Sequence, residues 1–141
     1  MRKQHEWVVL PLERSPLGLL YVSGAINGSP ITLLIDTGAN ATLLDRVWVA
    51  RHSLVGEPTE LGTIGCVTVN GIDMVDVDCL ELGAIRVEGI RLAVVDLSQV
   101  NRQLEQSASP AVGGILGADV LTERAAVIDY SDPRLQLLGV G

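Results

Sequence analysis

The residues best suited to chemistry follow an apolar run in the first third of the chain. Leu33–Ile35 leads directly into Asp36, Thr37 and Gly38. A buried strand would carry the Asp36 carboxylate into a poorly solvated place, which costs free energy unless hydrogen bonds compensate. Gly38 lets the main chain turn sharply and can offer its N–H to that carboxylate, while the Thr37 hydroxyl can bond to neighbouring main chain. The pattern indicates a positioned carboxyl group with a perturbed pKa.

The same triplet has a simpler interpretation as an ordinary turn after a strand, because Asp-x-Gly triplets are common in turns. A second segment bears on this choice. Ile115, Leu116 and Gly117 form an apolar-apolar-Gly segment late in the chain, directly before the short helix expected over 118–123. The presence of both segments, in this order, favours a functional interpretation of Asp36.

The ordered pair of segments resembles the retropepsin-like aspartic proteases. In that family an apolar-apolar-Asp-Thr-Gly-Ala motif, here Leu34–Ala39, precedes an apolar-apolar-Gly segment that opens a helix, here Ile115–Gly117. The resemblance covers about residues 17–138, and the closing hairpin at 125–138 is more like the bacterial single-domain members than the viral ones. It implies an all-β, pepsin-type closed barrel with one or two short helices.

The resemblance implies that Asp36 is the catalytic residue and that Thr37, Gly38 and Ala39 support the catalytic turn. The family's chemistry needs two carboxylates that share one water and one proton, because two like charges so close cannot both ionise easily. The sequence contains a single Asp-Thr-Gly. Asp119, inside the second segment, stands where the family more often has a structural polar residue. The second carboxylate is therefore expected from another chain, in a homodimer with the site on its two-fold axis.

The implied reaction is hydrolysis of peptide bonds in a peptide or protein substrate, without a cofactor. An alternative from another class is a catalytically silent module that dimerises, or binds an extended peptide, without cleaving it, because fold alone does not guarantee activity. The intact Asp-Thr-Gly at 36–38 favours the enzyme. A binding module has no need for a positioned acidic turn.

The family also closes a β-hairpin flap over its substrate, between the catalytic turn and the second segment. We expect the flap tip at 62–66, with Thr63, Ile64 and Gly65 against the substrate and strands 58–61 and 67–70 on either side. Asn70-Gly71 is a strong two-residue hairpin signal and a rival tip. The register of the flap stays open at this point.

The elements that must position these residues are mostly short strands. Apolar runs at 19–22 and 31–35 predict a hairpin around Asn27–Pro30. Asp45 is expected to cap a short helix that ends near Gly56, and the polar residues 97–112 predict a mobile loop. Further strands are expected at 42–44, several between 60 and 96 including 89–95, and in a closing hairpin of 125–130 with 135–138.

Length and composition fit one domain. The chain has 141 residues, of which 48% are hydrophobic and 3% aromatic, with no Phe. Its core must therefore be aliphatic, and β-branched residues favour strands. We expect an N-terminal arm at 1–16 and the protease-like domain at 17–141.

Charge and residue counts exclude several classes of function. A net charge of −7 without a basic patch argues against a nucleic-acid partner. No apolar run reaches the ~18 residues of a membrane span, and the start of the chain lacks the apolar region of a signal peptide. A soluble protein is expected, its compartment open but with the cytoplasm slightly favoured. Cys66 and Cys79 are expected to be buried thiols. We expect no metal site, because His5 and His52 are isolated and the spacing of the cysteines does not suit zinc.

Overall fold

The first hairpin shows how the sequence sets the fold. In the computed structural model, which describes residues 6–52, 58–59, 62–63, 66–69 and 72–139, β3 (Leu20–Ile26) pairs antiparallel with β4 (Ser29–Ile35). Asn27 and Gly28 join them with φ angles of 48° and 84°. A type I′ turn needs positive φ at both central residues, and Asn-Gly meets that need best. The hairpin expected from the sequence is confirmed, although Ser29 and Pro30 already belong to the strand.

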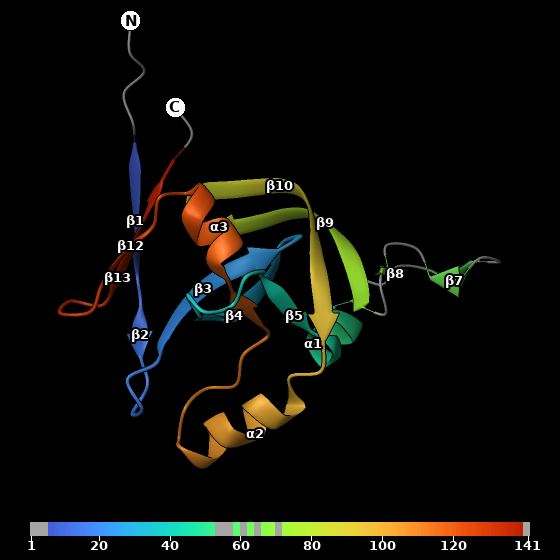
Figure 1. The fold of residues 1–141 in the computed structure, drawn as a ribbon, viewed down its shortest axis with the longest axis horizontal. Helices are drawn as coiled ribbons and strands as arrows, with labels where there is room; N and C mark the ends of the chain where they lie inside the picture. The colour runs from blue at the N-terminus through green and yellow to red at the C-terminus, as the bar shows by residue number, and fades with distance from the viewer. Residues whose placement is uncertain (1–5, 53–57, 60–61, 64–65, 70–71, 140–141) are drawn as a thin grey trace, which may run out of the picture.

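Six strands close into a barrel, which confirms the predicted all-β fold (Figure 1). The order is β3-β4-β11-β5-β10-β9, and pairing of β9 with β3 closes the ring. The short strand β2 (Glu13–Arg14) extends β3, and β8 (Cys66–Val69) extends β9. The remaining barrel strands are β5 (Leu43–Asp45), β9 (Ile72–Leu82), β10 (Ile85–Val95) and β11 (Gly114–Leu116).

The barrel interior is aliphatic, as the composition predicts. Leu33, Leu44, Leu80 and Leu116 are fully buried within it. Along β9 and β10 the apolar side chains alternate with exposed polar ones, as expected for strands with one face in the core and one in water. Burial of this aliphatic surface is the main force that holds the barrel closed.

A second, three-stranded sheet lies beside the barrel. It has the order β1-β13-β12, formed by β1 (Trp7–Pro11), β12 (Val127–Asp129) and β13 (Arg134–Leu138). The closing hairpin is thus confirmed, and the N-terminal arm adds a strand to it through five register pairs. One face of this sheet packs Leu135 and Leu137 into the core. β1 begins where β13 ends, with Trp7 opposite Leu138 (Figure 1).

Three helices complete the described part of the chain: α1 (Arg46–Arg51), α2 (Ser98–Gln106) and α3 (Ala118–Glu123). α3 has the predicted bounds, whereas α1 ends at Arg51, and residues 53–57 lie outside the described residues. Asp45 precedes α1 but does not cap it; its Oδ1 accepts a hydrogen bond from the Leu97 N–H (3.0 Å) instead. None of these helices is long and apolar enough to cross a membrane.

The prediction of a mobile loop over 97–112 is wrong, because α2 occupies its first half. Leu97 and Leu104 are buried in a second apolar cluster together with Tyr21. Leu97 and Leu104, seven positions apart, fall on one helical face. Burial of that face against Tyr21 stabilises a helix that the surrounding polar residues would not form alone. The sequence conceals this face because few apolar residues define it.

Candidate active site

Asp36 lies where β4 ends, next to the second segment. β4 runs parallel to β11, with Leu34 opposite Ile115 and Ile35 opposite Leu116. The Asp36 N–H donates to the carbonyl of Leu116 (3.1 Å) and continues this ladder by one residue. The fold therefore brings together two segments that lie about 80 residues apart in the sequence.

The turn after β4 orients the Asp36 carboxylate. The Gly38 N–H donates to its Oδ1 (2.9 Å), and the Ala39 N–H donates to its carbonyl oxygen (3.2 Å). A Cβ at Gly38 would lie 3.3 Å from the same Oδ1, so the glycine gives the carboxylate room. Asp36 is half-buried, whereas Thr37 and Gly38 are exposed. The carboxylate is thus held by the main chain and remains open toward the surface.

Gly117 allows the two segments to touch. The next residue, Ala118, donates its N–H to the carbonyl of Ala39 (2.7 Å). A Cβ at Gly117 would lie 2.6 Å from the carbonyl oxygen of Ala41, closer than non-bonded atoms approach. Glycine is required here by this close approach of two main chains. Ile115 and Leu116, just before it, are buried.

Thr42 and Asp119 fasten the same junction from the side. The Thr42 hydroxyl donates to Oδ1 of Asp119 (2.7 Å) and accepts the Gly117 N–H (3.0 Å). The Thr42 N–H donates to Oδ2 of Asp119 (3.1 Å). Asp119 therefore acts as a structural residue. Sequence analysis missed the part played by Thr42, although a hydroxyl directly before the apolar pair Leu43-Leu44 was a signal for it.

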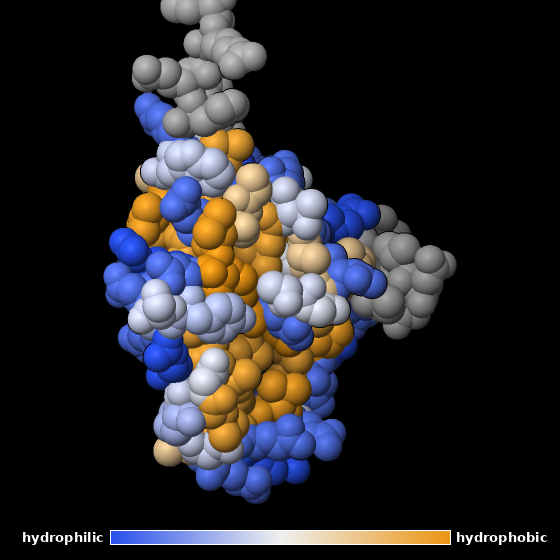
Figure 2. Space-filling model, turned by 60° about the vertical axis from the view of Figure 1, so that its left-hand side comes forward, coloured by the Kyte–Doolittle hydropathy of each residue, from blue (hydrophilic) through white to orange (hydrophobic). Residues whose placement is uncertain are grey.

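An apolar hollow of about 280 Å³ opens beside Thr37. Its other walls come from α3 and the segment that follows it: Ala118, Leu121, Thr122, Ala125, Ala126 and Ile128. Seen from the side on which β1, β12 and β13 lie, apolar surface runs down the molecule between polar margins (Figure 2). Trp7, Val9 and Val127 of these strands are about half exposed. An apolar face of this extent is typical of a surface that meets another protein.

Comparison with known proteins tests these expectations. A family model described as aspartyl protease matches residues 22–120, which is 99 of the 141 residues and includes both segments of the site. The chain belongs to this aspartyl protease family. Among curated proteins, none matches the sequence.

Solved structures place this aspartyl protease family member in the retropepsin-like fold. A retropepsin-like aspartic protease from Rickettsia conorii is similar with a TM-score of 0.64 and 17% identity, over 99% of each chain. The retroviral protease-like domain of Ddi1 from Leishmania major has a TM-score of 0.50 and 17% identity, over 80% of this chain and 82% of its own. The EIAV protease is 24% identical, with a TM-score of 0.49, over 77% of this chain and 90% of its own.

A flap tip at 62–66 requires strands 58–61 and 67–70 to pair with each other, and the structure shows a different pairing. β6 (Pro58–Thr59) pairs with β7 (Gly62–Thr63), and β8 pairs with β9, placing Val69 opposite Ile72. Thr63 thus lies in β7, while Ile64 and Gly65 lie outside the described residues. Strands 58–61 and 67–70 do not pair with each other in the described part of the chain. By contrast, β8 and β9, which lie on either side of the rival tip at positions 70–71, do pair with each other.

Three other residues considered from the sequence make contacts that stabilise the fold. Cys79 is a buried free thiol, and His52 stacks on Trp48 with the ring centres 4.1 Å apart. Asp76 is exposed and pairs with Arg91 (2.7 Å), whose hydrogen bond holds the pKa of Asp76 below its usual value. Within the described residues no three His, Cys, Asp or Glu side chains gather as metal ligands would.

Proposed function

We propose that this protein is an aspartic endopeptidase whose catalytic pair consists of Asp36 from each of two identical chains. The observation that carries the proposal is the fixed Asp36 carboxylate. It accepts the Gly38 N–H, and its main chain is bonded to Leu116 in the second segment. The aspartyl protease family and the retropepsin-like fold support the same chemistry.

In the proposed mechanism the two carboxylates share one proton. The ionised Asp36 accepts a proton from a water molecule, which attacks the carbonyl carbon of the scissile peptide bond. The protonated Asp36 of the second copy donates a hydrogen bond to the carbonyl oxygen and stabilises the charge that develops there. The Asp36 that took the proton from water then passes it to the peptide nitrogen, the carbon–nitrogen bond breaks, and the amine leaves. The Gly38 N–H, which points at Oδ1 of Asp36, keeps each carboxylate in place while its charge changes.

A homodimer is part of this proposal because the chain has one Asp-Thr-Gly. A two-fold axis that brings two Asp36 carboxylates together must also bring the partner against Thr37, the neighbouring exposed residue. The apolar hollow that Thr37 lines is suited to receive part of that partner. The apolar face of Figure 2 supports the same assembly.

The proposed substrate is an extended peptide, bound as an added strand through its main chain. The hairpin of β8 and β9 is the part of the described chain that best fits a flap, because its strands pair up to Val69 and Ile72. The first choice of tip, with Thr63, Ile64 and Gly65 against the substrate, remains a proposal. Cleavage assays of Gly65→Pro and Gly71→Pro would identify which segment closes over the peptide.

Replacement of the proposed catalytic residue tests the activity directly. Asp36→Asn should lower the cleavage rate of a diverse peptide mixture at least about a thousandfold, because an amide cannot accept the proton from water. Its stability should hold or rise, because the repulsion between two carboxylates is removed. Asp76→Asn, an exposed carboxylate on β9, is the matched control and should keep full activity. Cleavage by Asp36→Asn at the wild-type rate would exclude the proposed role.

A charge placed in the hollow tests the dimer. Thr122→Arg should lower the fraction of protein that sediments as a dimer and the cleavage rate per chain. An arginine in an apolar interface loses its hydration without gaining a partner. Glu123→Arg changes a neighbouring exposed position that does not line the hollow, and should leave both unchanged. A wild-type dimer that cleaves none of the peptides would instead favour the alternative, a silent dimerisation or peptide-binding module.

A further inference from the structure

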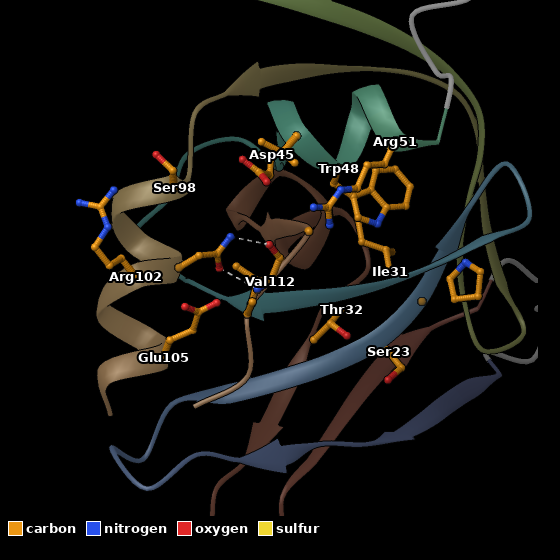
Figure 3. A pocket seen from close by; sticks show the side chains of 16 residues that line it. Ser23, Ile31, Thr32, Asp45, Trp48, Arg51, Ser98, Arg102, Glu105 and Val112 are labelled. Carbon is orange, nitrogen blue, oxygen red and sulfur yellow. Dashed lines mark hydrogen bonds between the residues drawn. The ribbon is translucent and has the colours of Figure 1, made fainter. Parts of the chain in front are cut away.

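A larger cavity lies away from the proposed catalytic turn. It has a volume of about 580 Å³, within the usual range for small-molecule sites, and opens between α1 and α2 (Figure 3). Its floor is the start of β4 around Ile31 and Thr32. Thr32 stands four positions before Asp36 in the extended chain of β4, which corresponds to roughly 13 Å. The cavity is therefore a separate site from the catalytic turn.

The cavity walls are held in place by specific bonds. Asn101 of α2 donates from its side-chain amide to the Val112 carbonyl (3.0 Å) and accepts the Val112 N–H (2.8 Å). The next residue, Gly113, donates its N–H to the Thr32 carbonyl (2.9 Å). These bonds tie the helix to the segment that follows it, and that segment to the floor. The cavity is thus formed before any ligand arrives, which lowers the entropy lost on binding.

Opposite walls of the cavity carry opposite charges. In Figure 3 the guanidinium of Arg51 extends from α1 into the cavity, and the carboxylate of Glu105 extends into it from α2. Neither side chain makes a hydrogen bond or ion pair with any part of the chain that the structure describes. Arg102 points away from the cavity, and the carboxylate of Asp45 already accepts the Leu97 N–H. Among the described residues of the lining, Arg51 and Glu105 are therefore the cation and the anion available to a ligand.

The rest of the lining is mixed. Ser23, Thr32, Ser98 and Asn101 contribute polar groups, and an apolar surface lies between them. Trp48 and Ile31 approach each other over Gly113, where a Cβ would lie 2.7 Å from both side chains. Pro30, Val47 and Val112 continue this surface. A ligand for the cavity must combine an apolar body with a positive and a negative end.

We propose that this cavity binds a short peptide with free ends. Its terminal carboxylate pairs with Arg51, its terminal ammonium pairs with Glu105, and its apolar side chains cover Trp48. The reverse orientation would place the ammonium against Arg51 and the carboxylate against Glu105, and both pairs of like charges would repel. In the proposed orientation the arginine can form two parallel hydrogen bonds with the carboxylate. Two or three extended residues span about 7–11 Å, and the cavity volume has room for more than a single amino acid. The inference does not rest on the proposed peptidase activity.

Calorimetric titration of the Asp36→Asn protein tests this binding without cleavage. The probes are Ala-Val and Ala-Val-Ala with free ends, the same peptides amidated or acetylated, and free valine. We expect saturable binding of the free peptides, weaker binding of valine, and roughly tenfold or greater loss when either end is blocked. Arg51→Gln should weaken binding of the free peptide but not further weaken that of the amidated one. Glu105→Gln should behave in the same way toward the acetylated peptide.

Arg102→Gln is the matched control, because the Arg102 side chain belongs to the cavity wall but points away from the cavity (Figure 3). The affinity of this variant for the peptides should equal that of the parent protein. Absence of saturable binding would overturn the proposal, as would equal affinity for free and blocked peptides. An equal loss in Arg102→Gln and Arg51→Gln would do the same, because it would indicate general charge attraction. None of these results bears on whether Asp36 in the wild-type chain cleaves peptides.

Discussion

The region around Asp36 and the region around α2 are held together by different means. At Asp36, main-chain hydrogen bonds join β4 to β11 and Gly117 lets two backbones touch, while Thr42 and Asp119 add side-chain bonds beside this contact. At α2, side chains make the connections: Asn101 binds Val112, and Asp45 binds Leu97. A junction made by main chains has no room for added atoms. A junction made by side chains can lose one bond and keep its shape.

The largest effect among these predictions is expected at the main-chain junction. Gly117→Ala would place a Cβ 2.6 Å from the Ala41 carbonyl oxygen, and neither backbone can move away without separating the two segments. We expect a loss of about 3 kcal/mol or more in the free energy of unfolding, and loss of peptide cleavage. Urea denaturation would measure the change in the free energy of unfolding, and a peptide assay the loss of cleavage. Gly89→Ala is the control for backbone strain without crowding, because φ is 61° there and a Cβ would meet nothing within 4 Å. It should lower the free energy of unfolding by less than Gly117→Ala does.

Thr42 should give the next largest effect. Thr42→Val keeps the shape but removes the hydroxyl, so the Gly117 N–H loses its acceptor and Asp119 loses a donor. A buried polar group without a partner costs about 1–3 kcal/mol, and we expect a loss of stability of that size. Thr42→Ser keeps the hydroxyl and should recover most of it. Equal stability of the two variants would contradict the role given to this hydroxyl.

A smaller effect is expected at α2. Asn101→Ala removes two hydrogen bonds to Val112, one from each side of its amide, and should lower the free energy of unfolding by about 1–2 kcal/mol. Because the bonds lie far from Asp36, peptide cleavage at a temperature where the variant is folded should be unchanged. Loss of cleavage with little loss of stability would mean that the two regions are coupled.

The smallest effect is a dependence on pH at the start of α2. Hydrogen bonds from the Ser98 side chain and N–H hold the pKa of Asp96 below its usual value of 3.8. The ionised form is therefore favoured by folding. Its contribution to stability is present above about pH 4 and is lost as the pH falls through the lowered pKa. NMR titration of Asp96 should give a value below 3.8, and Ser98→Ala should move it upward.

Local patterns predicted the barrel well where backbone geometry depends on neighbouring residues. Asn27-Gly28 defined the first hairpin, and the segment at Gly117 predicted the bounds of α3. The hairpin and the bounds of α3 could be predicted because each depends on a few residues with narrow conformational preferences. The resemblance to a family gave the order of the two segments, whereas the contact between Asp36 and Leu116 comes from the structure, since no short-range signal connects residues so far apart.

The features that sequence analysis missed depend on tertiary contacts. α2 forms because Leu97 and Leu104 meet Tyr21, a residue about 80 positions earlier, and the helix itself is mostly polar. Asp45 has the sequence position of a helix cap, yet the Leu97 N–H, brought near by β10, takes its carboxylate. In both cases a distant partner outweighs the local preference of the residue.

The pairing of β1 with β13 has a consequence for synthesis on the ribosome. Leu10 lies opposite Leu135, so β1 must wait for roughly 125 further residues before its neighbour exists. At about 5–20 residues per second this interval is on the order of 6–25 s. During that time the apolar residues of β1 lack their final partner and are available to chaperones. The second sheet is therefore among the last parts of the nascent chain to form, after the β3–β4 hairpin has had ample time to fold.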